Sequence, residues 1–225
     1  MLLRIVVFIC GAVVMSLEML ASRELTVQFG SALHVWGALI GTFIGALSLG
    51  YWLGGLTADR WPTRLGIAAI VSAAGILTTA LVPLSDPLAT FVFGLKGGDF
   101  LVAGGWLKPL LASAAIYGPT IVLLGMVSPY AVRLAARDLS RLGHRVGGLY
   151  ALSSLGSIFG TFLTAFHLVL VAGVSHIMMA EGLLLLALSV PVYLAGFFFE
   201  TGAAPAAAGG DPVNRRGDVG NNDLS

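Results

Sequence analysis

A basic segment that leads into an apolar segment with regularly spaced small residues decides the fold of this chain. Residues 133–145 contain four arginines, and residues 146–166 have the sequence VGGLYALSSLGSIFGTFLTAF. Short loops rich in arginine lie on the cytoplasmic side of a membrane. Small residues at intervals of three or four let helices approach closely in lipid, and the apolar segment has them at Ser153, Gly156, Gly160 and Thr164. The stretch therefore predicts a cytoplasmic boundary followed by a closely packed transmembrane helix.

Composition extends this prediction to the whole chain. Of the 225 residues, 57% are hydrophobic and 10% are charged, whereas an ordinary soluble domain has about 25% charged residues. Six apolar segments are long enough to cross a hydrocarbon core of about 30 Å as helices. They are 2–22, 33–55, 65–84, 107–132, 148–171 and 174–198. The sequence predicts an all-α, polytopic membrane protein with one transmembrane domain over residues 1–199 and the lipid bilayer as its partner.

The distribution of basic residues predicts the orientation and excludes one class of partner. With both termini in the cytoplasm, nine arginines fall inside and three basic residues fall outside. The inner set is Arg4, Arg60, Arg64, Arg133, Arg137, Arg141, Arg145, Arg215 and Arg216, and the outer set is Arg23, Lys96 and Lys108. Since the basic residues are confined to loops and the net charge is +1, no nucleic-acid partner is expected.

Three regions need separate predictions. Residues 85–106 combine proline, glycines and charges, which predicts an exposed loop with a short interfacial piece. Residues 200–225 are rich in Ala, Gly, Pro, Asn and Asp, which predicts a disordered cytoplasmic tail. The first apolar segment is expected to be a retained helix, because Glu18 interrupts it and Leu20 lies where a small residue would precede cleavage of a signal peptide.

Glycines in the second and fifth segments predict close helix packing. Gly37, Gly41 and Gly45 recur every four residues in the second segment, as Gly156 and Gly160 do in the fifth. Tight packing within one bundle explains this spacing, and a sliding surface in a transporter explains it as well. The second and fifth segments are the middle members of two successive triplets. Two three-helix units of opposite topology would make them equivalent, which is a recurring plan among transporters.

Two carboxylates within apolar segments are candidates for a polar membrane site. Glu18 lies in the first segment, about 21 Å along the helix from Arg4, and Glu181 lies in the sixth. A carboxylate in a membrane is costly unless it is neutral, paired or in a wet cavity. With the predicted orientation, a second group of residues lies near the same outer boundary: Arg23, His34, His167 and His176. These residues either line one outward-facing polar cavity or pair separately at the interface.

Other chemistry has little support in the sequence. Cys10 is the one cysteine and lies in an apolar run, and no pair of ligand residues has the spacing of a metal motif. There is no phosphate loop, nucleophile elbow or dinucleotide fingerprint. No catalytic, metal-ligating or cofactor-binding residue is therefore expected.

The loop between the second and third segments carries a first resemblance. Gly55 is followed by Asp59, Arg60 and Arg64, which resembles the cytoplasmic loop signature of the major facilitator superfamily. Asp59 can cap or form a salt bridge with a neighbouring helix end, and the arginines can hold the loop at the anionic leaflet. An ordinary positive-inside turn explains the same residues. With its two triplets, the chain resembles half of a major facilitator bundle.

Three stretches carry a second resemblance, which covers nearly the whole bundle. They are Leu17-Glu18 with Arg23 and residues 29–31, the second segment through Trp52 to Arg60, and residues 129–166 from Pro129-Tyr130 to Phe166. The chain resembles the membrane module of bacterial spermidine synthase-like proteins, in which a helical bundle is fused to an aminopropyltransferase domain. It departs from the family at Ser153-Ser154, where Asn-Thr is usual, and at Ala165, where Gly is usual.

The resemblance implies a function and a location. It implies an inner-membrane protein of bacteria that anchors or serves a polyamine-related aminopropyltransferase. These residues hold no transferase domain, so that domain would be fused or separately encoded. The two-triplet pattern favours an alternative, a transporter of a small cationic or organic solute that acts as a homodimer. A third hypothesis is an enzyme that acts through its own outer ionisable cluster.

Overall fold

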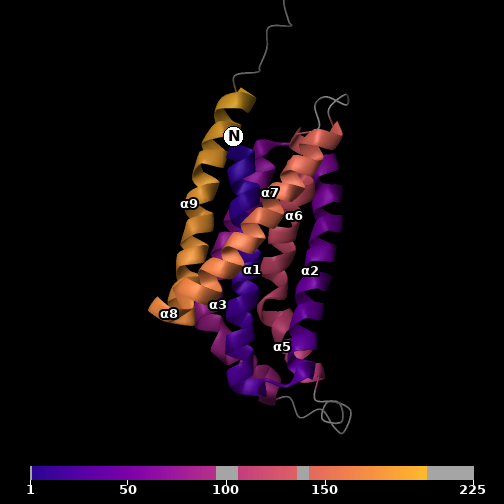
Figure 1. Ribbon diagram of the computed structural model, residues 1–225. Coiled ribbons are helices and arrows are strands. Elements are labelled where there is room, and N and C mark those ends of the chain that lie inside the picture. Colours follow the sequence, from indigo (N-terminus) through magenta and orange to yellow (C-terminus); the bar gives the residue numbers. More distant parts are fainter. Residues whose placement is uncertain (1, 95–105, 136–141, 202–225) are drawn as a thin grey trace, which may run out of the picture.

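The computed structural model describes residues 2–94, 106–135 and 142–201, and in these ranges the chain is helical with no strand. Figure 1 shows a bundle of long helices. The elements are α1 (Leu2–Phe29), α2 (Leu33–Arg60), α3 (Arg64–Gly94), α5 (Leu107–Ile116), α6 (Gly118–Ala135), α7 (Leu142–Leu163), the π-helix η2 (Thr164–Leu168), α8 (Val169–Val171) and α9 (Val174–Thr201).

Six helical stretches of the described chain are long and apolar enough to cross a membrane. They are Leu2–Phe29, Leu33–Arg60, Arg64–Ser85, Gly118–Ala135, Gly143–Val171 and Val174–Phe197. Helices satisfy every backbone hydrogen bond within the segment, which the bilayer interior demands. The predicted class, an all-α polytopic membrane protein, is confirmed. The start of α1 and the end of α9 lie at the same end of the bundle (Figure 1).

The loop predicted for residues 85–106 is wrong for its first part. Helix α3 continues to Gly94 and includes Pro83 and Pro87. Prolines suggest a loop in a sequence because each removes a backbone donor, yet helices in membranes tolerate them where neighbouring groups satisfy the freed carbonyls. Residues 95–105 of that loop and residues 202–225 of the predicted tail lie outside the described residues, and residues 200–201 belong to α9.

The helical path is irregular at two spans. The short helix α5 precedes the fourth span and is separated from it at Tyr117, where α5 ends and α6 begins. Gly118 and Pro119 follow this break, and Pro119 has no N–H to continue the helical ladder. The fifth span changes from α7 to a π-helical turn at Thr164, whose carbonyl accepts a hydrogen bond from the Val169 N–H. Such turns add one residue to the hydrogen-bonded ring and recur at functional sites.

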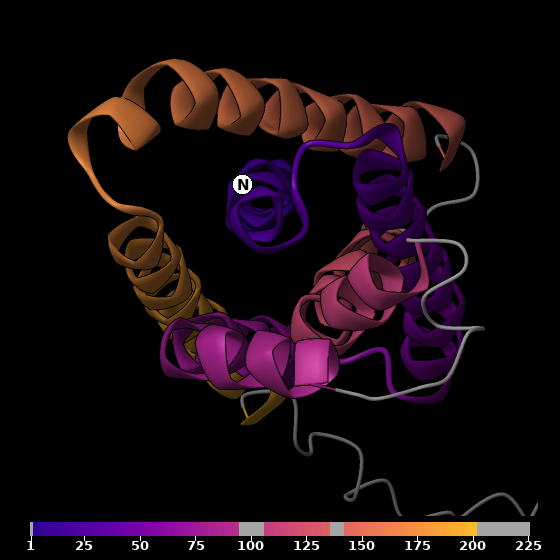
Figure 2. The same cartoon turned by 90° about the horizontal axis from the view of Figure 1, so that it is seen from below.

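The spans pair most closely as α1 with α7, α2 with α6, and α3 with α9. Helix α1 lies in the centre of the bundle when it is viewed along the helices (Figure 2). Its side chains supply much of the hydrophobic core, including Val6, Leu17 and Leu20, which are fully buried. The core therefore surrounds the first helix.

The contacts of α1 with α7 repeat those of α6 with α2. A Cβ on Gly156 would meet the carbonyl oxygen of Phe8, and a Cβ on Gly50 would meet that of Val122. One turn further, Gly160 meets Ala12 as Gly54 meets Met126. The pair Gly11 and Ser153 has the counterpart Gly125 and Leu47. One constant offset in residue number relates α1 to α6, and another relates α2 to α7.

The contacts between α3 and α9 repeat within the pair itself. A Cβ on Gly75 would meet Leu186, and a Cβ on Gly182 would meet Thr79. A third constant offset maps Gly75 onto Gly182 and Thr79 onto Leu186. Spans one to three are therefore exchanged with spans four to six by an approximate two-fold operation. Because each unit has an odd number of spans, the units cross the membrane in opposite directions, as predicted from the two triplets.

Candidate functional site

The carboxyl group of Glu181 lies buried between three elements. The Ser16 hydroxyl of α1 donates a short hydrogen bond to Glu181 Oε1 on α9. Ser16 Oγ also lies 2.5 Å from Thr164 Oγ1, at the first residue of η2. The exposed fraction is 7% for Glu181, 3% for Ser16 and 1% for Thr164, so the cluster is sealed inside the bundle. We call these three residues the carboxyl cluster.

The carboxyl cluster lies well inside the lengths of the helices that form it. Glu181 is about 10 Å along α9 from its start, and Ser16 is about 21 Å along α1 from its start, by helix rise. The cluster also joins the two three-helix units, because Ser16 belongs to the first unit while Thr164 and Glu181 belong to the second. It therefore lies at the interface between the repeats.

One oxygen of this carboxyl group has no partner. Glu181 Oε2 is buried and forms no hydrogen bond with any described residue. A buried polar atom without a partner loses its hydration with nothing in exchange, which costs about 1–3 kcal/mol. The hydroxyl oxygen of Thr120 is the other buried side-chain atom of the described residues without a partner, and Glu181 Oε2 is the one that belongs to an ionisable group.

The other residues of the predicted polar site do not join Glu181. Glu18 is half-buried and lies two residues from Ser16, about 200° around α1, so it faces away from α9. Arg23, His34, His167 and His176 are exposed. No hydrogen bond or ion pair within the described ranges joins these five residues to the carboxyl cluster. The histidines and carboxylates therefore form no common constellation, and the described residues contain no group of three or more metal ligands.

Sequence reasoning missed the partners of Glu181. In the sequence Thr164 stands out only as one of the regularly spaced small residues, and Ser16 lies beside the more conspicuous Glu18. A hydroxyl residue in an apolar helix is a weak signal, because it can satisfy itself by bonding a carbonyl of the preceding turn. A second, partly buried contact has no signal in the sequence either: Tyr117, between α5 and α6, donates a short hydrogen bond to Glu24.

Of the glycines predicted to pack helices, those of the fifth span lie at a helix contact within the described chain and those of the second span do not. Gly156 and Gly160 lie against the backbone of α1. No heavy atom lies within 4 Å of a Cβ built on Gly37, Gly41 or Gly45, and α2 packs on α6 through glycines further along. The five residues from Gly45 to the first of these, Gly50, turn the helix by about 140°. The two sets of glycines consequently lie on different faces.

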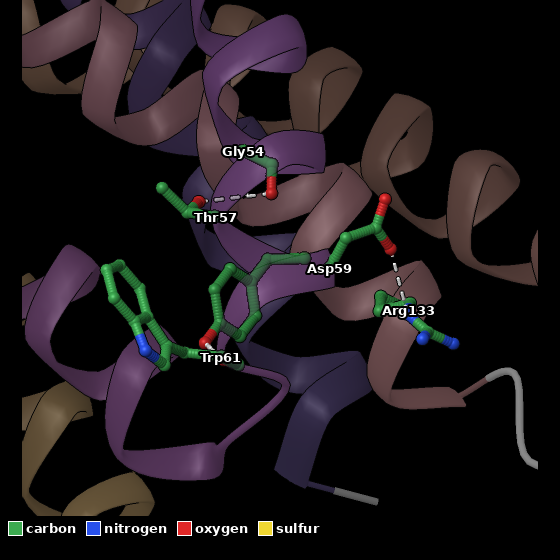
Figure 3. Close-up of polar contacts among 6 residues, drawn as sticks. Gly54, Thr57, Asp59, Trp61 and Arg133 are labelled. Carbon is green, nitrogen blue, oxygen red and sulfur yellow. Dashed lines mark hydrogen bonds and ion pairs between the residues drawn. The ribbon is translucent and has the colours of Figure 1, made fainter.

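The inner-loop residues make local contacts at the end of the bundle where the chain begins. Asp59 pairs with Arg133 at 2.9 Å (Figure 3), as expected of a carboxylate near a neighbouring helix end. Arg60 lies over the Trp61 ring at 5.8 Å. Gly55 has open space at its Cβ position, and Arg64 begins α3. In the same region Tyr130 donates a short hydrogen bond to the Trp61 carbonyl, which ties the loop after α2 to α6.

Comparison with known proteins finds no relative. No family model matches the sequence, and neither the curated proteins nor the solved structures contain a match. The fold and the site together define a multi-pass α-helical membrane protein with an inverted repeat and a buried carboxyl group between the repeats.

Proposed function

We propose that this chain is a membrane transport protein for a small organic solute and that Glu181 carries the exchanging proton or cation. The observation that carries the proposal is the buried carboxyl group with one unpartnered oxygen at the interface between the two units. Ionisable residues inside membrane bundles mark ion, proton and substrate pathways. Transporters with inverted repeats hold their sites at the repeat interface, next to interrupted helices.

The irregular turn beside Glu181 supports the same proposal. Thr164 is the first residue of η2, so its hydroxyl bonds Ser16 where the regular helix ends. π-helical turns inside α-helices are frequent at functional sites, and we infer that η2 can convert to a regular α-helical turn. Such a shift would move Thr164 relative to Ser16 and open the carboxyl cluster without unfolding α7. This gives the bundle a local route to expose Glu181.

A purely structural role for Glu181 makes a different prediction. As a hydrogen-bonded staple between α1 and α9, its side chain could be replaced by glutamine, which has the same shape and retains an acceptor for Ser16. Glutamine cannot exchange a proton or neutralise a cation. Glu181→Gln therefore distinguishes a structural role, which the variant should keep, from a transport role, which it should lose.

Uptake into proteoliposomes tests the proposal. The purified protein is reconstituted, and uptake of labelled spermidine and of a panel of neutral and anionic organic solutes is measured under an imposed pH gradient. We expect wild-type uptake of at least one solute above empty liposomes, a loss of more than tenfold in Glu181→Gln, and uptake within twofold of wild type in Glu18→Gln, the matched carboxylate outside the cluster. Equal uptake by wild type and Glu181→Gln, or no uptake of any solute, would contradict the proposal.

The proposed transporter acts as a homodimer, as a six-helix chain needs a second copy to enclose a path. The open glycines Gly37, Gly41 and Gly45 support this, because small residues on a lipid-facing surface allow another helix to approach closely. Photobleaching steps of labelled protein in dilute bilayers report the number of copies. Single-step bleaching throughout would exclude the dimer.

A second candidate function is a membrane subunit that anchors a polyamine-related aminopropyltransferase in a bacterial inner membrane. One contact favours it, because the second and third stretches that resemble the spermidine synthase-like family meet through Asp59 and Arg133. Co-purification from the native host under mild solubilisation tests this candidate. Recovery of the chain without any transferase-like protein would count against it.

A further inference from the structure

A pocket of about 550 Å³ lies at the end of the bundle where the chain begins. Five spans contribute to it: α1, α3, α6, α7 and α9. Its walls include the apolar side chains of Val6, Ile67 and Val192, which are buried. Val6 and Val192 lie on the same two helices as Ser16 and Glu181, about 15 Å further along the helix axes. The pocket and the carboxyl cluster are thus separate sites.

Three arginines line this pocket, and no acidic residue of the described ranges 2–94, 106–135 and 142–201 lines it. Arg4 comes from α1, Arg64 from the start of α3 and Arg145 from α7. One nitrogen of Arg145 donates to the Ala135 carbonyl at 3.3 Å, which directs the guanidinium toward the end of α6. Guanidinium groups bind phosphate oxygens through paired hydrogen bonds, with better geometry than a lysine can offer. Three of them around one opening make a site for a phosphate group.

The apolar side chains that line the pocket favour a phospholipid over a free phosphate ion as its ligand. A free phosphate would fill the charged rim and leave the buried valine and isoleucine walls beside water, whereas a lipid covers both. Basic pockets between membrane helices on the cytoplasmic side bind anionic head groups, and the predicted orientation places this pocket there. We propose that the pocket binds the phosphate group of an anionic phospholipid, whose glycerol and first acyl carbons lie against Val6, Ile67 and Val192.

Lipid titration of the intact protein tests the proposal. Binding of phosphatidylglycerol to the detergent-purified chain is measured by native mass spectrometry and by the rise in unfolding temperature, with phosphatidylcholine and inorganic phosphate as comparison ligands. We expect phosphatidylglycerol to bind at least tenfold more tightly than phosphatidylcholine. Arg4→Gln and Arg145→Gln should each weaken it by roughly fivefold, the effect of one basic residue near a membrane surface.

Arg60→Gln is the matched control, since Arg60 lies at the same end of the bundle and does not line the pocket. It should bind phosphatidylglycerol within twofold of wild type. An equal loss in Arg60→Gln would mean general surface attraction and overturn the site. Competition by inorganic phosphate as strong as that of the lipid would overturn the lipid as occupant, and equal binding of both lipids would overturn the selectivity. Glu181→Gln should bind lipid as wild type does, so failure of the transport proposal leaves this result unaffected.

Discussion

Gly75 of α3 and Gly182 of α9 approach each other reciprocally. A Cβ on Gly75 would lie 2.9 Å from the Gly182 carbonyl oxygen, and a Cβ on Gly182 would lie 3.0 Å from the Gly75 carbonyl oxygen. Gly75 and Gly182 are therefore equivalent positions in the first and second three-helix units. The approximate two-fold axis of the inverted repeat passes close to this contact, and the absence of two side chains lets α3 and α9 cross there.

Substitution of Gly182 should weaken the bundle. Gly182→Ala places a methyl group against Thr79 and the Gly75 carbonyl, and such overpacking costs about 1–3 kcal/mol. The free energy of unfolding is measured by titration with SDS in mixed micelles. Gly41→Ala is the control, because its Cβ position is open, and alanine should raise helix stability by about 0.5–1 kcal/mol. Equal effects of the two substitutions would refute the close contact.

The repeat predicts matched losses at equivalent glycines. Gly54→Ala and Gly160→Ala each drive a methyl group into the backbone of the paired helix, at Met126 and Ala12 respectively. Both should destabilise by a similar amount, about 1–3 kcal/mol, in the same SDS titration. A large effect at one position and none at the other would show that the two helix pairs are not equivalent.

The carboxyl cluster should show a non-additive pattern of stability. Ser16→Ala removes the donor to Glu181 Oε1, leaves the whole carboxyl group without partners, and should cost about 1–3 kcal/mol. Adding Glu181→Met removes the stranded group, so the double variant should recover most of the loss. Thermal unfolding in detergent compares the two variants. A double variant less stable than Ser16→Ala would contradict the cluster.

The hydrogen bond of Tyr130 should contribute more to the stability of the protein than the exposed ion pair between Asp59 and Arg133. Tyr130→Phe removes the hydrogen bond to the Trp61 carbonyl at a side chain that is 1% exposed and should cost about 0.5–1.5 kcal/mol. Tyr150→Phe, at an exposed ring, should change little. Asp59→Asn breaks an exposed ion pair and should cost roughly 0.2–1 kcal/mol, an effect that added salt reduces. A loss of stability in Asp59→Asn that does not change with added salt would indicate that Asp59 acts otherwise than through this ion pair.

Orientation can be measured with single cysteines in a Cys10→Ala background. Ser31→Cys lies between α1 and α2 and should react with a membrane-impermeant maleimide in intact cells. Gly143→Cys, near the start of α7, should react only after permeabilisation. The reverse pattern would invert the topology and place the arginine pocket outside.

Hydropathy predicted the spans because the bilayer imposes one solution on every apolar segment of sufficient length. The partners of those spans were harder to predict. Periodicity places Gly45 and Gly50 on separate faces of α2 and does not say which face meets α6. The bond between Ser16 and Glu181 joins residues far apart in sequence, and it depends on how α1 and α9 rotate about their axes. Pro87, together with the glycines and charges that follow it, predicted a loop from residue 85, since local propensity ignores the packing that maintains α3 around this proline.

The carboxyl cluster has no equivalent in the other half of the protein. The offsets that relate the glycine contacts map its members to buried positions of the fourth, second and third spans. The residues at those positions are Tyr130, Ala58 and Ala74. An exchange of conformation between the two units would therefore connect two states of unequal energy. If the protein transports solute as proposed, either its inward-open or its outward-open state should predominate at rest. Binding of a proton or cation at Glu181 would then change the populations of these two states.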